Sequence, residues 1–74
     1  MKTTVYRPYQ NDYPKVLDWL LENVGNAPVV KYGDYWAAKG WTAWHTNVGN
    51  PLYMALRVDF DRSEDAVLFS VRWL

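Results

Sequence analysis

Cysteine is absent from this chain of 74 residues. A chain without thiols has no disulfide and no thiolate metal site, and it is typical of a reducing compartment, so we expect a cytoplasmic protein. The sequence also has no apolar run near the ~20 residues that a membrane-spanning helix needs. Residues 1–8 lack the apolar stretch of a signal peptide. We therefore expect one small globular domain over residues 1–74, without membrane contact.

An excess of charge of either sign is also missing, because eight basic side chains balance eight acidic ones. A small domain that binds nucleic acid through a positive field is normally basic, and a protein that mimics DNA is strongly acidic. The balance disfavours both classes. Nucleic acid is therefore not the partner that we expect first.

Residues for catalysis are scarce. His45 is the only histidine, and Ser63 and Ser70 are the only serines. One histidine provides neither a zinc-binding pair nor a strong basis for a triad, and neither serine lies in a Gly-x-Ser-x-Gly turn. The glycines form no phosphate-binding loop. We predict that the chain is not an enzyme and has no cofactor, and that His45 is a packed or surface side chain.

One spacing resembles that of a calcium-binding loop, in which oxygen ligands recur at every second residue. Asp59, Asp61, Ser63 and Asp65 have this spacing. However, Glu64 stands where such a loop needs a glycine for its sharp turn. We predict a strand end and a helix start here, and no metal site.

Aromatic residues are abundant, with five Trp, six Tyr and two Phe. A domain this small buries a limited share of its surface, and large rings are an efficient way to fill its core. The same residue types anchor protein interfaces. Some of the rings are therefore expected to form the core and others a binding surface.

One helix is predicted over Asp12–Val24. Its apolar residues recur at helical spacing, at Tyr13, Leu17, Leu20, Leu21 and Val24. Pro14 fits a first helical turn, and Gly25 with Pro28 is typical of the region after a helix end.

Short runs rich in β-formers, separated by turn signals, predict strands in the rest of the chain. Gly33-Asp34 is interpreted as a bulge that interrupts one strand, and Lys39-Gly40 and Gly49-Asn50-Pro51 as turns. The predicted strand segments are Thr3–Tyr6 at an edge, Val29–Tyr32 with Tyr35–Ala38, Trp41–Val48, and Leu52–Phe60. The last three form an antiparallel meander.

The segment 63–73 fits two interpretations. Asp61 or Ser63 followed by Glu64 and Asp65 resembles a capped helix start with acids in its first turn. Alternating apolar residues favour a strand instead, at Val67, Phe69, Val71 and Trp73. We favour the helix, because the start signals are more specific than strand propensity.

The sequence therefore predicts an α+β domain, with one amphipathic helix on an antiparallel sheet of three to four strands and a short C-terminal helix. Along Trp41–Val48, side chains alternate between the two faces of the sheet. Trp41 and His45 point one way and Trp44 the other. A single helical layer would thus cover only one of these two tryptophans.

Several aromatic motifs resemble those of short uncharacterised accessory proteins of tailed bacteriophages. They lie mainly in the C-terminal half, at Tyr32-Gly33-Asp34-Tyr35-Trp36, Gly40-Trp41, Asp59-Phe60, Glu64–Phe69 and Arg72-Trp73. The resemblance implies a viral accessory protein in the host cytoplasm that binds and modulates a host or defence protein.

We expect a non-enzymatic protein-binding module that blocks its target sterically. The candidate binding residues are the rings Trp19, Trp36, Trp41, Trp44 and Tyr53, with Lys39 or Arg57 orienting the partner at the rim. Two alternatives stay open. Single-stranded nucleic acid would stack on Trp36, Trp44 and Tyr53 and meet Lys31, Lys39 and Arg57. A homo-oligomer would use the same rings for self-assembly.

Overall fold

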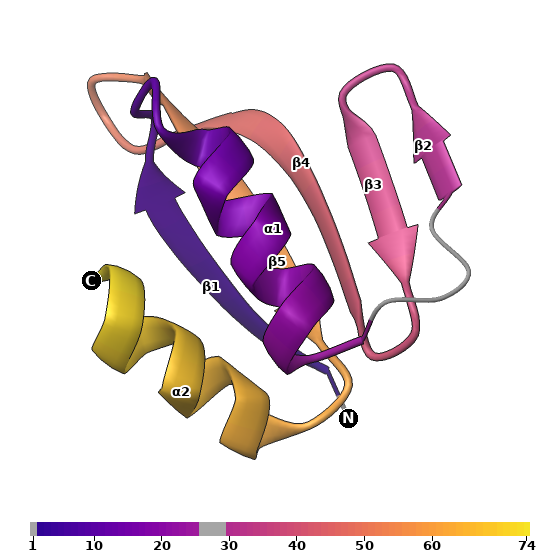
Figure 1. Cartoon of the computed structure of the whole chain (residues 1–74). Coiled ribbons are helices and arrows are strands. Elements are labelled where there is room, and N and C mark those ends of the chain that lie inside the picture. The colour runs from indigo at the N-terminus through magenta and orange to yellow at the C-terminus, as the bar shows by residue number, and fades with distance from the viewer. Residues whose placement is uncertain (1, 26–29) are drawn as a thin grey trace.

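The computed structural model describes residues 2–25 and 30–74. Five strands and two helices follow one another along the chain (Figure 1). They are β1 (Thr3–Pro8), α1 (Tyr13–Asn23), β2 (Val30–Tyr32), β3 (Tyr35–Ala38), β4 (Trp41–Val48), β5 (Tyr53–Phe60) and α2 (Ser63–Trp73).

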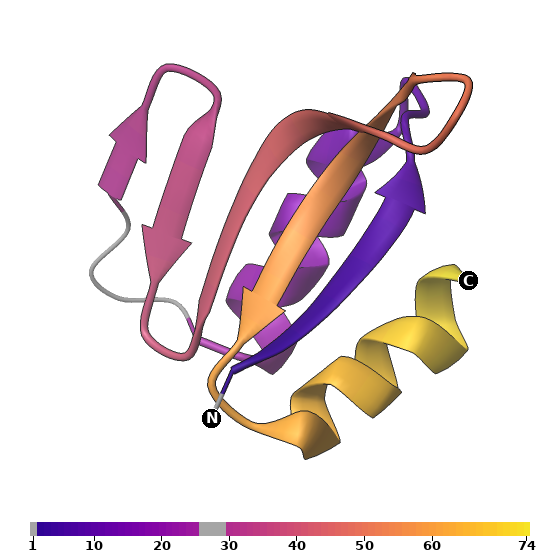
Figure 2. The same cartoon turned by 180° about the vertical axis from the view of Figure 1, so that it is seen from behind.

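The strands form one antiparallel sheet in the order β1-β5-β4-β3-β2. α1 crosses one face of this sheet, and α2 lies beside α1 along β1 (Figure 1). Seen from behind, β1, β5 and β4 lie in front of α1, with no helix between them and the viewer (Figure 2). Within the described residues the domain thus has two layers, with helices on one side and strands alone on the other.

The α+β class and the antiparallel sheet are confirmed, but the sheet has five strands rather than three to four. The difference lies at Gly33-Asp34, which reverses the chain instead of forming a bulge. Gly33 has a φ of 60° and occupies the turn position that a type II′ hairpin gives to glycine. Tyr32 therefore pairs with Tyr35, and β2 and β3 are separate strands. Val29, the first residue of the predicted strand segment Val29–Tyr32, lies outside the described residues.

The predicted helix over Asp12–Val24 is confirmed, one residue shorter at each end. Val16, Leu17 and Leu20 are buried against the sheet, as the helical spacing requires. Pro14 lies in the first turn, whose N–H groups have no partner within the helix. Pro28 lies outside the described residues.

The helical interpretation of the segment 63–73 is confirmed and its strand alternative is wrong. Ala66 and Phe69 are buried, and Phe69 packs on Phe60 and Trp19. The predicted side-chain cap is also wrong. Arg62 occupies the cap position without a side-chain bond to the backbone, and the Ser63 hydroxyl donates to Glu64.

The core lies between the helices and the strands β1, β5 and β4. Trp41 pairs with Phe60 across the sheet, and both rings are buried. The Nε1–H of Trp41 donates to the Gly25 carbonyl oxygen at 2.8 Å. A Cβ at Gly25 would lie 1.8 Å from the backbone oxygen of Lys39. The end of α1 therefore packs directly against the β3–β4 turn, and only glycine fits there.

Arg7 connects three elements on the covered face. Although it is charged, it is buried on β1, and its two terminal nitrogens donate to the Asp12 carboxylate at 3.0 and 3.2 Å. Its guanidinium carbon lies 5.2 Å from the centre of the Trp73 ring. The hydrogen bond from Arg7 lowers the pKa of Asp12. Arg7 thus joins β1 to the start of α1 and to the last turn of α2.

Neither helix of the described residues combines the length and the apolar character that crossing a bilayer requires.

Candidate partner-binding face

The face of the sheet that points away from both helices carries a row of large side chains, one from each strand. We call this side the open face and the row the central row. The pairing register places the five members side by side, in the order Tyr32, Tyr35, Trp44, Arg57 and Tyr6. In strand order they come from β2, β3, β4, β5 and β1, so the row crosses the whole sheet.

Contacts within the central row hold its middle members against one another. The Tyr35 and Trp44 ring centres are 5.6 Å apart. The Arg57 guanidinium carbon lies 4.8 Å from the Trp44 ring centre and 5.9 Å from that of Tyr6. Arg57 therefore lies between two aromatic rings, which limits its rotation and presents a cation with apolar neighbours.

A row of polar side chains, Thr4, Asp59 and Thr42, runs beside the central row, and the Asp59 carboxylate balances the charge of Arg57. Asp59 lies between Thr4 and Thr42 in the register, and the Thr4 hydroxyl donates to its carboxylate. Nε of Arg57 donates to the same carboxylate at 3.3 Å. Asp59 is thus satisfied, although it is buried, and it fixes the near edge of the Arg57 guanidinium.

Exposure differs along the central row. Tyr6, Tyr32 and Tyr35 are exposed, while Trp44 and Arg57 are half-buried by their neighbours. The described residues enclose no pocket. A small ligand would therefore find no concave site in this part of the structure.

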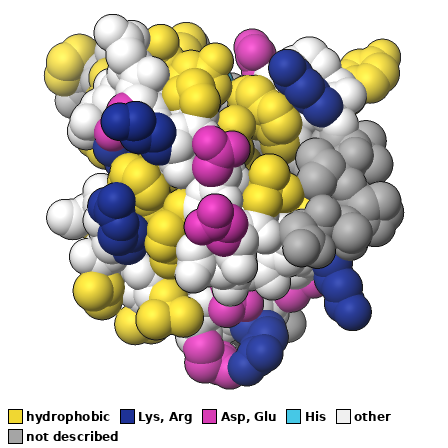
Figure 3. Space-filling model, viewed as in Figure 1, with side chains coloured by type: hydrophobic (Ala, Val, Ile, Leu, Met, Phe, Trp, Pro, Cys, Tyr) yellow, Lys and Arg dark blue, Asp and Glu magenta, His cyan; other side chains and the backbone are white. Residues whose placement is uncertain are grey.

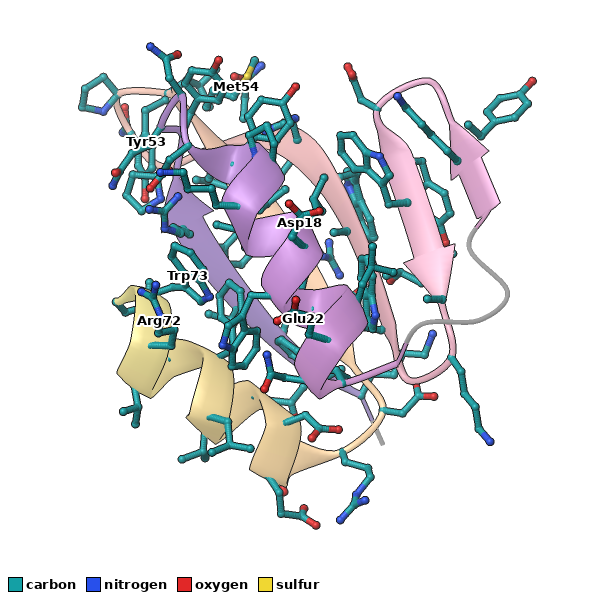
Figure 4. The ribbon with its side chains drawn as sticks, viewed as in Figure 1. Asp18, Glu22, Tyr53, Met54, Arg72 and Trp73 are labelled. Atoms are coloured by element: carbon teal, nitrogen blue, oxygen red, sulfur yellow. The ribbon has the colours of Figure 1, made fainter. Side chains whose placement is uncertain are left out.

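Three of the predicted binding residues lie on the open face. Trp44 and Arg57 are neighbours at its centre. Tyr53 pairs with Val48 at the start of β5, at the far end of the sheet from the start of α2 (Figure 4). Tyr53 is exposed, so it extends the surface beyond the central row.

The other predicted rings, Trp19, Trp36 and Trp41, do not share this surface. Trp41 is 2% exposed and belongs to the core. Trp36 pairs with Ala43 on the helix-covered face, where its ring packs near Tyr13. Trp19 lies on α1, half-buried against Phe69.

The predicted basic residues also lie in different parts of the structure. Lys39 lies in the β3–β4 turn, away from the central row. Lys31 pairs with Trp36, so it points to the covered face. Among the described strand residues of the open face, Arg57 is the only basic side chain. The predicted role of Arg57 at the rim is replaced by a position at the centre.

No protein-family model, curated protein or solved structure matches this chain. The open face is therefore the feature from which a function is inferred.

Sequence reasoning missed Tyr6, Tyr32 and Tyr35. Tyr35 and Trp44 have the same orientation because the β3–β4 turn has two residues, which pairs Ala38 with Trp41. That turn was predicted, so the pairing of Tyr35 with Trp44 was available from the sequence. Tyr6 carried no such signal, because its neighbour Arg57 lies on a strand about fifty residues later.

His45 lies on the covered face within a cluster of three rings. Its ring centre is 4.7 Å from that of Tyr13, 5.5 Å from Tyr9 and 5.9 Å from Trp36. Its Nε2 atom is buried and has no hydrogen-bond partner among the described residues. Among residues 2–25 and 30–74, no group of three or more acidic or histidine side chains is arranged to hold a metal ion. His45 is thus a packed side chain in this structure.

Proposed function

We propose that this chain is a non-enzymatic protein-binding module and that its partner docks on the central row of the open face. The observation that carries the proposal is the composition of that row. It consists only of Tyr, Trp and Arg, which are the residue types enriched in interface hot spots and in the cores of interfaces.

The arrangement of Arg57 supports a partner that presents a carboxylate. Within the described residues, the hydrogen bond of Arg57 to Asp59 uses only Nε, so the two terminal nitrogens are available to a ligand. A guanidinium held between rings presents a planar pair of donors that matches a carboxylate. The partner is therefore a protein surface with an Asp or Glu side chain surrounded by apolar groups, which would pack on Trp44, Tyr35 and Tyr6.

The proposed mechanism is steric. A sheet face that docks on a target covers the target's own binding surface, and no chemical step is needed. The resemblance of this chain's aromatic motifs to those of phage accessory proteins would make the target a host or defence protein.

Binding of single-stranded nucleic acid is the second candidate, since rings on an open sheet face are suitable for stacking with bases. The charge of the face favours a protein instead. Arg57 is its only basic strand residue among those described, and Asp59 lies beside it. A chain of phosphates would therefore meet little net positive charge.

The test uses the tagged chain as bait in a nuclease-treated bacterial lysate. The baits are the wild type, Trp44→Ala, and Leu52→Ala as a control at an exposed turn residue away from the central row. We expect a stoichiometric protein that the wild type and Leu52→Ala retain. Trp44→Ala should bind the purified protein at least about 30-fold more weakly, since a hot-spot ring contributes about 2 kcal/mol or more.

Two Arg57 variants then test the partner chemistry. Arg57→Gln removes the cation and Arg57→Lys keeps it while removing the planar fork. Both variants should bind the partner more weakly than the wild type, and Arg57→Gln should bind it more weakly than Arg57→Lys. Equal retention of every protein by wild type and Trp44→Ala contradicts docking on the central row. Salt-dependent binding of 15-mer oligonucleotides, with no protein retained, would favour the second candidate.

A further inference from the structure

A second apolar surface lies on the outer side of α2. Four aliphatic side chains there are exposed, at 55 to 81% of their full areas. They are Val67, Leu68, Val71 and Leu74, and we call them the α2 stripe. Val67 and Val71 are one helical turn apart, so the four side chains share one side of the helix. In the space-filling view, apolar surface gathers at the lower left, over α2 (Figure 3).

The other helix shows what an outer side normally carries. α1 packs on the same face of the sheet, and its outward side bears Asp18 and Glu22, which point away from the strands (Figure 4). α2 instead has Val71 on its exposed side, where 81% of this side chain is accessible. Both sides of α2 are thus apolar, because Ala66 and Phe69 occupy its inner side.

A helix that is apolar on both sides is normally buried on both sides, and a contiguous apolar patch on a small domain marks an interaction surface. The central row does not explain the α2 stripe. The row runs across the five strands on the open face, and none of its members lies on α2.

We propose that the α2 stripe is covered by the α2 stripe of a second copy of this chain, with the two helices antiparallel about a two-fold axis. In such an isologous contact each copy presents the same patch to the other, so one self-complementary stripe is sufficient. Val67 of each copy would pack near Val71 of the other.

Charge complementarity supports the second copy and sets the antiparallel orientation. Glu64 stands one turn before Val67, at the N-terminal end of the stripe, and Arg72 follows Leu68 by one turn at the other end. Antiparallel helices bring the Glu64 of each copy near the Arg72 of the other. Parallel helices would instead place like charges and like helix ends together.

Both charged side chains are accessible for these contacts. Arg72 is exposed, and it stacks on Trp73 with 4.1 Å between the guanidinium carbon and the ring centre. Glu64 accepts from Arg62 at 2.9 Å, and each carboxylate oxygen accepts more than one hydrogen bond. The bond from Arg62 lowers the pKa of Glu64 to about 2, so Glu64 is ionised at neutral pH.

The size of the contact predicts a weak dimer. Each helix has eleven residues, or a length of about 16 Å at 1.5 Å per residue. Two such helices bury an area at the low end of specific interfaces, which extends below about 1,200 Å² in total. We therefore expect a dissociation constant on the order of tens of micromolar.

Sedimentation equilibrium of the full chain, from a few micromolar to several hundred micromolar, tests the dimer. The wild type should shift from 8.7 kDa to twice that mass across this range. Val71→Lys should stay monomeric, with at least a tenfold weaker association. Leu52→Lys is the matched control, because it adds the same charge at an exposed leucine in the β4–β5 turn and should dimerise like the wild type. Circular dichroism establishes that both variants are folded.

A charge reversal tests the orientation. Arg72→Glu alone and Glu64→Arg alone should each weaken the dimer, and the two changes in one chain should restore it. A wild type that remains monomeric at several hundred micromolar overturns the proposal. So does a dimer that Val71→Lys leaves intact and Trp44→Ala dissolves, or a monomer whose α2 stripe binds neutral or anionic phospholipid vesicles instead.

Discussion

The two faces of the sheet are built from the same kinds of residue and use them differently. Each face has a tryptophan from β4, Trp41 on the covered face and Trp44 on the open face. Each face also has an arginine that pairs with an aspartate and lies close to a tryptophan ring. On the covered face these groups are enclosed by helices and stabilise the fold. On the open face no helix covers these groups, and we propose that they contact a partner.

The largest difference in stability between the two faces is expected from substitutions of Trp41 and Trp44. Trp41→Ala removes a buried ring and its bond to Gly25, so the free energy of unfolding should fall by about 3 to 5 kcal/mol. Trp44→Ala removes a half-buried ring from the open face and should cost about 1 kcal/mol. Urea unfolding followed by circular dichroism measures both. Equal losses would show that the open face is part of the stabilising core.

Arg7 on the covered face and Arg57 on the open face should differ in the same way, with a smaller difference in the free energy of unfolding. The Arg7 side chain is 5% exposed and forms two bonds to Asp12, whereas that of Arg57 is 35% exposed and uses one nitrogen on Asp59. Arg7→Met should lower the free energy of unfolding by about 2 kcal/mol, because hydrogen bonds between charged groups are lost. Arg57→Met should lower it by at most about 1 kcal/mol.

Chemical denaturation of the two methionine variants under one set of conditions gives the difference directly. A larger loss for Arg57→Met would contradict the assignment of Arg57 to binding. An unchanged stability in Arg7→Met would mean that the three elements it joins are held by other contacts.

The smallest expected effect is a pH dependence from the covered face. The hydrogen bond from Arg7 lowers the pKa of Asp12 in the folded chain. A lowered folded-state pKa contributes stability above the unfolded value of about 4, and this contribution is lost as the pH falls through the folded value. Asp12→Asn should therefore reduce the fall in stability below pH 4. Asp18→Asn, on the outward side of the same helix, is the control. Identical acid profiles for wild type and Asp12→Asn would rule out this contribution.

Local patterns predicted much of the fold. Helical spacing identified α1, and alternation along β4 correctly separated Trp41 from Trp44. The acidic start identified α2 despite the alternating apolar residues in that segment. These features depend on neighbours within a few residues, so the sequence contains the information.

The candidate site depends on pairings that local patterns do not encode. The bulge interpretation of Gly33-Asp34 concealed the β2–β3 hairpin and left Tyr32 without a position. Trp36 was grouped with Trp44, although the two-residue β3–β4 turn places it opposite Ala43 on the other face. Tyr6 joins Arg57 only because β1 pairs with β5, and nothing near Tyr6 in the sequence indicates that strand.

The pairing of β1 with β5 also determines the order in which the chain becomes stable during synthesis. The partners of β1 are residues 55–60, so β1 has no complete neighbour in the described sheet until translation has passed residue 60. Until then, the apolar side of α1 and the Trp41 ring have only part of their packing surface. Contacts so distant in sequence slow folding, since a long loop must close first. A ribosome that stalls before Phe60 would therefore expose a nascent chain rich in uncovered aromatic rings, which is a substrate for chaperones and proteases.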